Sequence, residues 1–160
     1  MVPGPLPIEL LNLIWESMDN YLEMPNPVKE YLGFEYSALY FYLWRPFLQD
    51  VLNKITTPQP SDINAIPSSV RTRAQNATNS SIKLVARIRP WSFINWFSIR
   101  QSFMATLLVV AVSRTMEDWV LEKELTDTLD GATEIFARTF KIFEAARRAL
   151  HLISEIRAST

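Results

Sequence analysis

The chain has 160 residues, a formal net charge of −1 and 48% hydrophobic residues, which suits one globular domain with a single core. A net charge this close to zero argues against a nucleic-acid-binding domain. The sequence contains no cysteine, which excludes disulfide bonds, thiolate metal ligands and a cysteine nucleophile.

The N-terminal segment 1–7 contains three prolines and a glycine. We expect it to be a flexible leader, or the edge of a cut inside a longer protein. The residues that follow are predicted to form a helix, because apolar side chains recur at three- and four-residue steps until Pro25 and Pro27 end the pattern. These apolar residues are Ile8, Leu11, Trp15, Met18 and Leu22.

The segment 34–48 is the most aromatic part of the chain. Its apolar side chains cover almost the whole surface of a helix, so we expect this helix to be central in the domain. Proline lacks an amide hydrogen and disfavours helical geometry in the residue before it, so the helix should kink or restart near Arg45 and continue after Pro46 to about residue 55. We expect Arg45 to be at least half buried and bonded to helix-end carbonyls or to an acidic residue. Segment 8–55 therefore holds the N-terminal helices.

Segment 56–69 is predicted to be the linker loop of the domain. Pro58, Pro60 and Pro67 lie there among serine, threonine, glutamine and asparagine. A loop of this length in a compact domain is usually functional or mobile, and we expect it to be poorly ordered.

Segment 70–160 is predicted to contain the C-terminal helices of the same domain. A helix with apolar residues from Val70 to Ile88 stops before Pro90, and the next helix is expected to begin at an N-cap near Ser92. We expect the second of these helices to bury its large apolar side chains. These are Phe93, Trp96, Phe97, Phe103, Met104, Leu107, Leu108 and Ala111.

A fifth helix is expected to start between Glu117 and Leu121. Its apolar phase continues across Gly131, which favours one helix through the glycine, with a break there as the alternative. The last helix is predicted from Ile142, Ala146, Ala149, Ile153 and Ile156. No stretch longer than four residues alternates between apolar and polar residues convincingly enough for a strand. The sequence therefore predicts an all-α single domain of six to seven helices, several strongly buried, with one long Pro/Ser-rich loop.

The charges are unevenly distributed along the chain. Residues 63–116 contain seven basic residues and no acidic residue, whereas the segments on either side are acidic. We favour a basic middle packed between acidic ends over a patch for an anionic partner. Residues 89–100 also interleave bases with aromatics, as stacking on single-stranded nucleic acid would need. Because Trp96 and Phe97 share a helical phase with an apolar run, we interpret these aromatics as core.

No catalytic or metal site is predicted. His151 is the only histidine, and it can pair with Glu155 one turn later, but no second base or nucleophile lies at a recognisable spacing. The acidic residues from Glu117 to Asp130 are spread around a helix without a Glu-x-x-His pattern, so we interpret them as a solvated face. The apolar run from Phe103 to Val112 is shorter than the roughly 20 residues that span a bilayer. We expect no enzyme activity, no cofactor and no membrane as a partner.

One motif resembles a known family. The aromatic helix that ends in Trp44, Arg45, Pro46 and Phe47 resembles the hydrophobic-Arg-Pro-Phe-Leu signature of the middle homology region, the regulatory domain of fungal binuclear zinc-cluster transcription factors. Further segments are similar to that region in the same order. They are Trp15–Pro25 before the motif, Ala74 and Ala77 ahead of Ile82–Ile88, the apolar Gln101–Ser113, and Ala145–Ile153 near the end.

The resemblance implies the C-terminal part of that regulatory domain, in a nuclear protein. The zinc-cluster cysteines are absent, so this chain is expected to make no direct contact with nucleic acid. The resemblance implies action through intramolecular contacts or protein partners of a transcription factor, or through a small-molecule effector. It supplies no ligand residues, and Trp44, Arg45, Pro46 and Phe47 are implied as a structural motif only. Two other classes stay open. One is a helical enzyme with an aromatic pocket, and the other is a membrane-associated helical protein suggested by Trp91–Val112.

Overall fold

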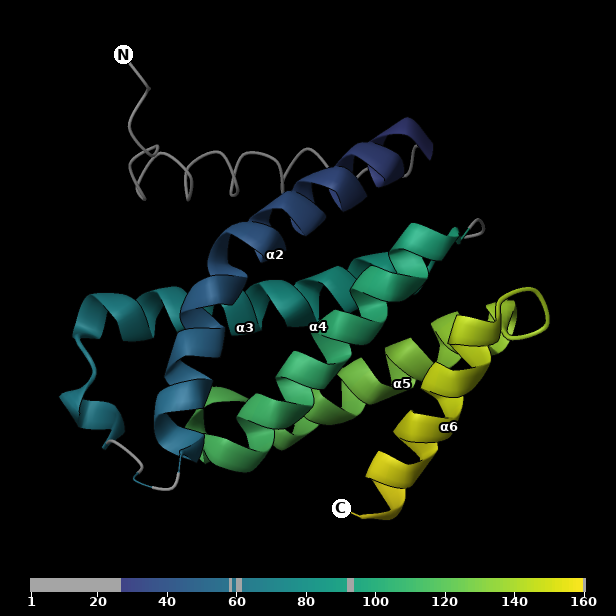
Figure 1. Cartoon of the computed structure of the whole chain (residues 1–160). Helices are drawn as coiled ribbons and strands as arrows, with labels where there is room; N and C mark the ends of the chain where they lie inside the picture. The colour runs from purple at the N-terminus through teal and green to yellow at the C-terminus, as the bar shows by residue number, and fades with distance from the viewer. Residues whose placement is uncertain (1–26, 58, 60–61, 92–93, 160) are drawn as a thin grey trace.

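The computed structural model describes residues 27–57, 59, 62–91 and 94–159 (Figure 1). These residues form α-helices and two short 3-10 turns without any strand, so the predicted all-α class is confirmed. The leader 1–7 and the helix predicted before Pro25 lie outside the described residues. The elements are α2 (Pro27–Thr56), η1 (Ile63–Ala65), α3 (Ser68–Ile88), α4 (Trp96–Thr115), η2 (Glu117–Trp119), α5 (Glu122–Thr139) and α6 (Glu144–Ala158).

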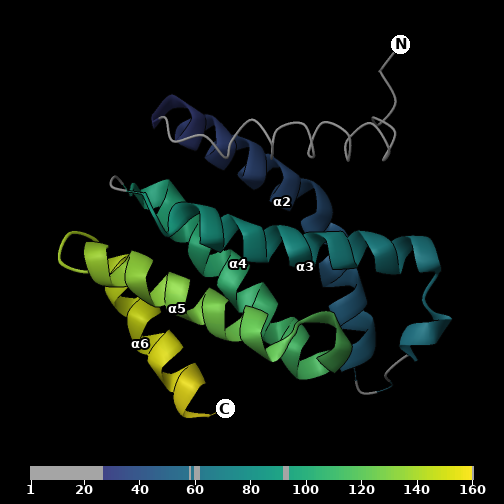
Figure 2. The ribbon, with the colours of Figure 1, turned by 180° about the vertical axis from the view of Figure 1, so that it is seen from behind.

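The long helix α2 runs without interruption through Pro46. Figures 1 and 2 show its axis changing direction part of the way along, so a kink and not a restart accommodates the proline. One face of α2 is buried, including Phe41 and Leu48, and it packs mainly against α3. The expectation of a helix buried almost all round is wrong, because Leu39 and Leu43 on the other side are exposed.

The connection from α2 to α3 has local structure in its second half. Asp62 caps the turn η1, because its Oδ1 accepts a hydrogen bond of 2.9 Å from the amide of Asn64. Ile66 is buried, and Pro67 directly precedes α3. The connection therefore ends two residues before the end of the predicted loop 56–69, while Pro58 and Pro60 lie outside the described residues.

Helix α4 begins later than predicted. Asn95 is its N-cap and forms a capping box with Ser98, in which the Ser98 amide donates to Asn95 Oδ1 at 2.8 Å and the Asn95 amide donates to Ser98 Oγ at 3.0 Å. The cap expected at Ser92 is therefore wrong, and Ser92 itself lies outside the described residues. Because the start is displaced, Trp96 occupies the first turn, where its side chain is 52% exposed.

The buried face of α4 also differs from the prediction. Leu108 is buried as expected, and Phe93 lies outside the described residues. Several other predicted core residues are only half-buried, namely Phe97, Phe103, Met104, Leu107 and Ala111. Small and polar residues are buried more deeply on this helix, including Ser98, Gln101, Ser102 and Thr106.

A similar set of polar residues is buried on α3, which packs against α4, namely Thr78, Ser80 and Ser81. Their hydroxyls bond within their own helices. Ser81 Oγ donates to the carbonyl four residues earlier at 2.8 Å, and Thr106 Oγ1 does the same at 2.7 Å. A hydroxyl that is satisfied in this way costs little when buried, and its small side chain allows two helices to approach closely. The burial of these polar residues could not be predicted from hydropathy alone.

Helix α4 is long and apolar enough to cross a membrane by length and composition, with a mean hydropathy of 1.3. In the described fold, 56% of that window is buried against the rest of the protein. A core helix of this length meets the same two criteria.

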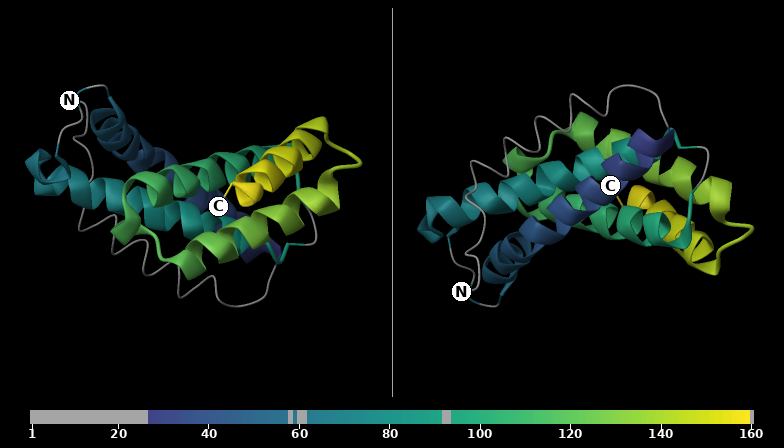
Figure 3. Two further views of the ribbon diagram at one scale, coloured as in Figure 1. Left: turned by 90° about the horizontal axis from the view of Figure 1, so that it is seen from below. Right: turned by 90° about the horizontal axis from the view of Figure 1, so that it is seen from above.

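Helices α5 and α6 form an antiparallel pair on the far side of α4 from α2 (Figures 1 and 3). The helix start expected between Glu117 and Leu121 is instead the turn η2, and α5 begins at Glu122. Helix α5 continues through Gly131, as predicted in preference to a break at this glycine. In the last helix Ala146, Ala149 and Ile153 are buried as predicted. Ile142 lies in the loop before α6 and is 75% exposed, so its assignment to the buried face is wrong.

Candidate functional site

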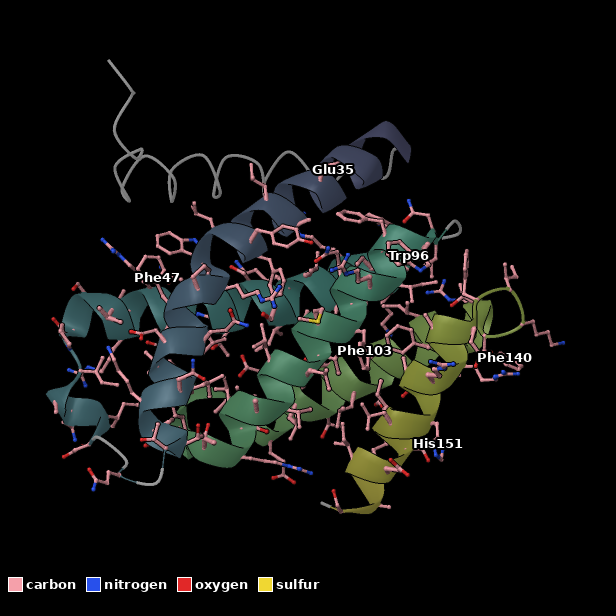
Figure 4. The ribbon with its side chains drawn as sticks, in the orientation of Figure 1. Glu35, Phe47, Trp96, Phe103, Phe140 and His151 are labelled. Atoms are coloured by element: carbon pink, nitrogen blue, oxygen red, sulfur yellow. The ribbon has the colours of Figure 1, made fainter. Side chains whose placement is uncertain are left out.

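The Trp-Arg-Pro-Phe motif (Trp44, Arg45, Pro46 and Phe47) lies within α2, and Figure 4 shows Phe47 beside the bend of that helix. Trp44 is 2% exposed, and its ring centroid lies 6.0 Å from that of Phe47 at an interplanar angle of 47°. Pro46 is exposed, which suits a residue that cannot donate to the helix. The two aromatic residues of the motif, Trp44 and Phe47, therefore pack against each other.

The half-buried Phe47 connects α2 to α3. The Cζ atom of Arg73 lies 4.8 Å from the centroid of the Phe47 ring, which is within the range of a cation–π contact. Arg73 Nε is buried and has no hydrogen-bond partner in the described part of the chain. The ring face therefore provides an electrostatic contact for this guanidinium. This role of Arg73 could not be predicted from the sequence, because no spacing rule connects a residue on one helix with a ring on another.

A polar contact connects the aromatic helix to α4. Gln101 Nε2 donates to the hydroxyl of Tyr42, and the Tyr42 ring also packs edge-on against Phe41 with centroids 5.8 Å apart. Gln101 is 1% exposed, and its Oε1 has no partner among the described residues. The predicted apolar face of α4 therefore carries a buried amide that orients one ring of α2.

The structure places Arg45 as half-buried, in agreement with the expected burial. The expected bonds to carbonyls or to a carboxylate are not found among the described residues. Arg45 Nε is buried there without a hydrogen-bond partner. A continuous helix explains the difference, since the kink at Pro46 does not open α2 into two ends with a set of free carbonyls.

Replacing Arg45 with methionine should therefore raise the free energy of unfolding by about 1 kcal/mol. The physical reason is that a buried donor without a partner costs roughly 1–3 kcal/mol, whereas methionine fills a similar volume without a polar group. Chemical denaturation of the wild type and of Arg45→Met would measure the change. Arg148→Met is the matched control, because Arg148 is exposed on α6. A clear loss of stability in Arg45→Met would instead show that the guanidinium has a bonding partner.

A second set of polar contacts joins the end of α3 to α5. Arg89 forms a bidentate pair with Glu134, with distances of 2.8 Å from Nε and 2.5 Å from NH2 to the carboxylate oxygens. Arg138 donates from NH1 to the carbonyl oxygen of Trp91 at 2.6 Å and from NH2 to that of Arg89. These contacts hold the α3–α4 connection against the last turn of α5.

The hydrogen bond from Arg89 lowers the pKa of Glu134 from its ordinary value of 4.5. A carboxyl group with a lowered folded-state pKa stabilises the fold above its unfolded-state pKa, and this contribution is lost as the pH falls through the lowered value. Glu134→Gln should therefore melt below the wild type at neutral pH, and the difference in Tm should disappear in acid. Thermal melts from neutral to acidic pH would measure this. A Tm difference that does not change with pH would contradict it.

The residues considered for catalysis and metal binding take other roles. His151 is exposed, and its Nε2 lies 3.4 Å from Oε1 of Glu155, the partner that the helical spacing suggested. In the acidic segment, Glu124 accepts a hydrogen bond from the amide at the start of α5, and Asp130 pairs with Arg157 at 2.5 Å. Within the described ranges no three histidine, aspartate or glutamate side chains meet as a metal site.

The junction of α2, α3 and α4 around the Trp-Arg-Pro-Phe motif is therefore the candidate site. It joins three segments that lie far apart in the sequence, and its contacts are aromatic packing, one cation–π contact and one buried amide. Comparisons with models of protein families, with curated proteins and with solved structures found no match to this chain.

Proposed function

We propose that this chain is a regulatory domain of a fungal-type transcription factor that does not contact DNA itself. It would act in the nucleus through intramolecular contacts or protein partners, and binding of a small-molecule effector is a second route to the same control. The observation that carries the proposal is the packing among the segments on which the resemblance rests. The helix with Trp44 and Phe47 packs on the helix that buries Ala74 and Ala77.

The third segment of the resemblance, Gln101–Ser113, also meets this junction, because it lies in α4 and Gln101 bonds Tyr42 on α2. A motif whose residues pack together across three helices has a role in maintaining a fold. This supports reading the motif as structural, as the resemblance implied, with function on the surfaces that the motif positions. Our proposal includes a total of six to seven helices, of which residues 8–24 would supply the additional helical part.

The outer face of α2 is the surface that we propose for regulatory contacts. Leu39 is 66% exposed, and Tyr42 and Leu43 are each 42% exposed, one helical turn or less apart. Neighbouring exposed apolar side chains of this kind are typical of contact surfaces with protein partners. The burial of the opposite face of α2 against α3 keeps these residues in a fixed arrangement.

A reporter assay tests the proposal. Residues 1–160 would be fused between a heterologous DNA-binding domain and an activation domain, and reporter expression would be compared with the same fusion lacking the chain. We expect the chain to lower activation. Leu39→Lys combined with Leu43→Lys should restore it, whereas Leu121→Lys, which changes an exposed leucine at the start of α5, should not. Unchanged activation with the wild-type chain, with the fusion protein present at normal levels, would contradict a regulatory role.

A further inference from the structure

We propose that one end of the helical bundle is a docking surface for an anionic lipid bilayer. We call this end the basic tip and define it as residues 87–91, 94–100 and 134–148. It contains the end of α3, the start of α4 and the connection from α5 to α6, which lie at the same end of the molecule in all views (Figures 1–3). The inference is independent of the proposed regulatory function.

The basic tip exposes large apolar side chains from the start of α4 and from the connection between α5 and α6. Trp96 is 52% exposed, Phe140 is 40% exposed and Ile142 is 75% exposed, and Figure 4 shows Trp96 and Phe140 at this end. Each ring has a cation beside it. Arg100 Cζ lies 5.8 Å from the Trp96 ring, and Lys141 Nζ lies 6.0 Å from the Phe140 ring. Apolar side chains flanked by long cationic ones are suited to the boundary between lipid headgroups and acyl chains.

The charge of the molecule is arranged to direct this end towards an anionic surface. The basic tip contains seven basic and two acidic residues. Residues 117–124, at the opposite end of α5, contain four acidic residues and one basic residue, whereas Asp127 and Asp130 lie within electrostatic reach of Arg89. The net charge of −1 thus conceals two ends of opposite sign, and such a charge distribution orients a protein in the field of an anionic membrane.

Some cations of the basic tip remain available for lipid headgroups. Its two acidic residues are engaged by arginines, since Glu134 pairs with Arg89 and Glu144 pairs with both Arg147 and Arg148. Arg100 and Lys141 have no carboxylate partner in the described part of the chain. They are also the cations adjacent to the exposed rings, so charge and apolar area coincide.

The side chains favour a lipid surface over nucleic acid. Ile142 is the most exposed of the three apolar residues, and an aliphatic side chain cannot stack on a base. It can instead bury its apolar surface among acyl chains, away from water. Peripheral docking of this kind needs no membrane-spanning helix. It is therefore compatible with the position of α4 in the core.

Sedimentation of the 160-residue chain with vesicles tests the proposal. We expect the chain to sediment with phosphatidylcholine vesicles that contain phosphatidylserine, and not with phosphatidylcholine vesicles alone. Binding should weaken as salt is added, because headgroup attraction is screened over about 8–10 Å at physiological ionic strength. Lys141→Ala should reduce the partition coefficient about fivefold, as expected for one basic residue near the surface. Ile142→Asp should reduce it about tenfold.

Leu121→Asp is the control, because Leu121 is 67% exposed at the acidic end of α5. It should sediment as the wild type does, and circular dichroism should show all three variants to be folded. Equal sedimentation with both vesicle types, or unchanged binding of folded Ile142→Asp and Lys141→Ala, would overturn the proposal. So would binding to a single-stranded oligonucleotide, or association of the chain with itself, that requires the same residues while phosphatidylserine vesicles are not bound.

Discussion

Replacing Phe41 with alanine is expected to lower the free energy of unfolding by about 3–5 kcal/mol, the usual cost of removing a buried phenylalanine ring. Phe41 has an exposed fraction of 0% and lies on the face of α2 that packs against α3. The alanine variant would lose the transfer free energy of the ring and leave a cavity, because the surrounding structure usually relaxes only in part. Denaturant unfolding followed by circular dichroism measures the change.

Leu39→Ala is the matched control for this experiment, because Leu39 lies two residues away on the same helix and is 66% exposed. Surface substitutions of this type usually change stability by less than about 0.5 kcal/mol. Similar losses in the two variants would mean that the face of α2 with Leu39 is covered in solution. Similar small effects would mean that α2 does not contribute to the core.

Replacing Gly131 with leucine is expected to destabilise the fold by about 1–3 kcal/mol or more, because it inserts a side chain into a closely packed contact between α5 and α3. Gly131 is buried, and a Cβ atom built there would lie 3.2 Å from Val85 Cγ1 and 3.4 Å from Arg89 Cδ. Leucine adds three more carbons to this already close contact, so Val85 and Arg89 would have to move further than for a methyl group. A thermal melt would show the loss as a lower Tm.

Gly131→Ala separates the two physical effects at this position. Alanine gains about 1 kcal/mol in helix propensity over glycine, and this offsets the small movement that its methyl group requires of Val85. We expect its stability to stay close to that of the wild type. If the leucine variant were as stable as the alanine variant, then α5 would not approach α3 as closely as these distances state.

The two proposals assign regulatory contacts and lipid binding to different surfaces of the same fold. The regulatory proposal uses the outer face of α2 around Leu39 and Leu43, and the lipid proposal uses the basic tip around Lys141 and Ile142. Each set of substitutions therefore serves as a control for the other assay. A variant with lysine at positions 39 and 43 should still bind phosphatidylserine vesicles, and Ile142→Asp should still lower reporter activation.

The sequence by itself determined the class of the fold and several helix limits. Helical periodicity is a local property, because residues three and four apart share a face whatever lies opposite. The continuation of α5 through Gly131 and the end of α3 before Pro90 could therefore be predicted. The burial of Arg45 also followed from its position in an aromatic helix.

Only the tertiary structure decided which faces are covered and which residues meet. An apolar pattern indicates that a face can be buried, but the neighbouring helices decide whether it is, as the exposed Leu39 and Trp96 show. The contact of Arg73 with Phe47 joins different helices, and no local spacing encodes it. The basic tip likewise arises because two connections far apart in sequence meet at one end of the bundle, held by the bonds of Arg138. Packing between helices depends on the shapes and lengths of whole elements, whereas a sequence pattern reports only the face of each helix.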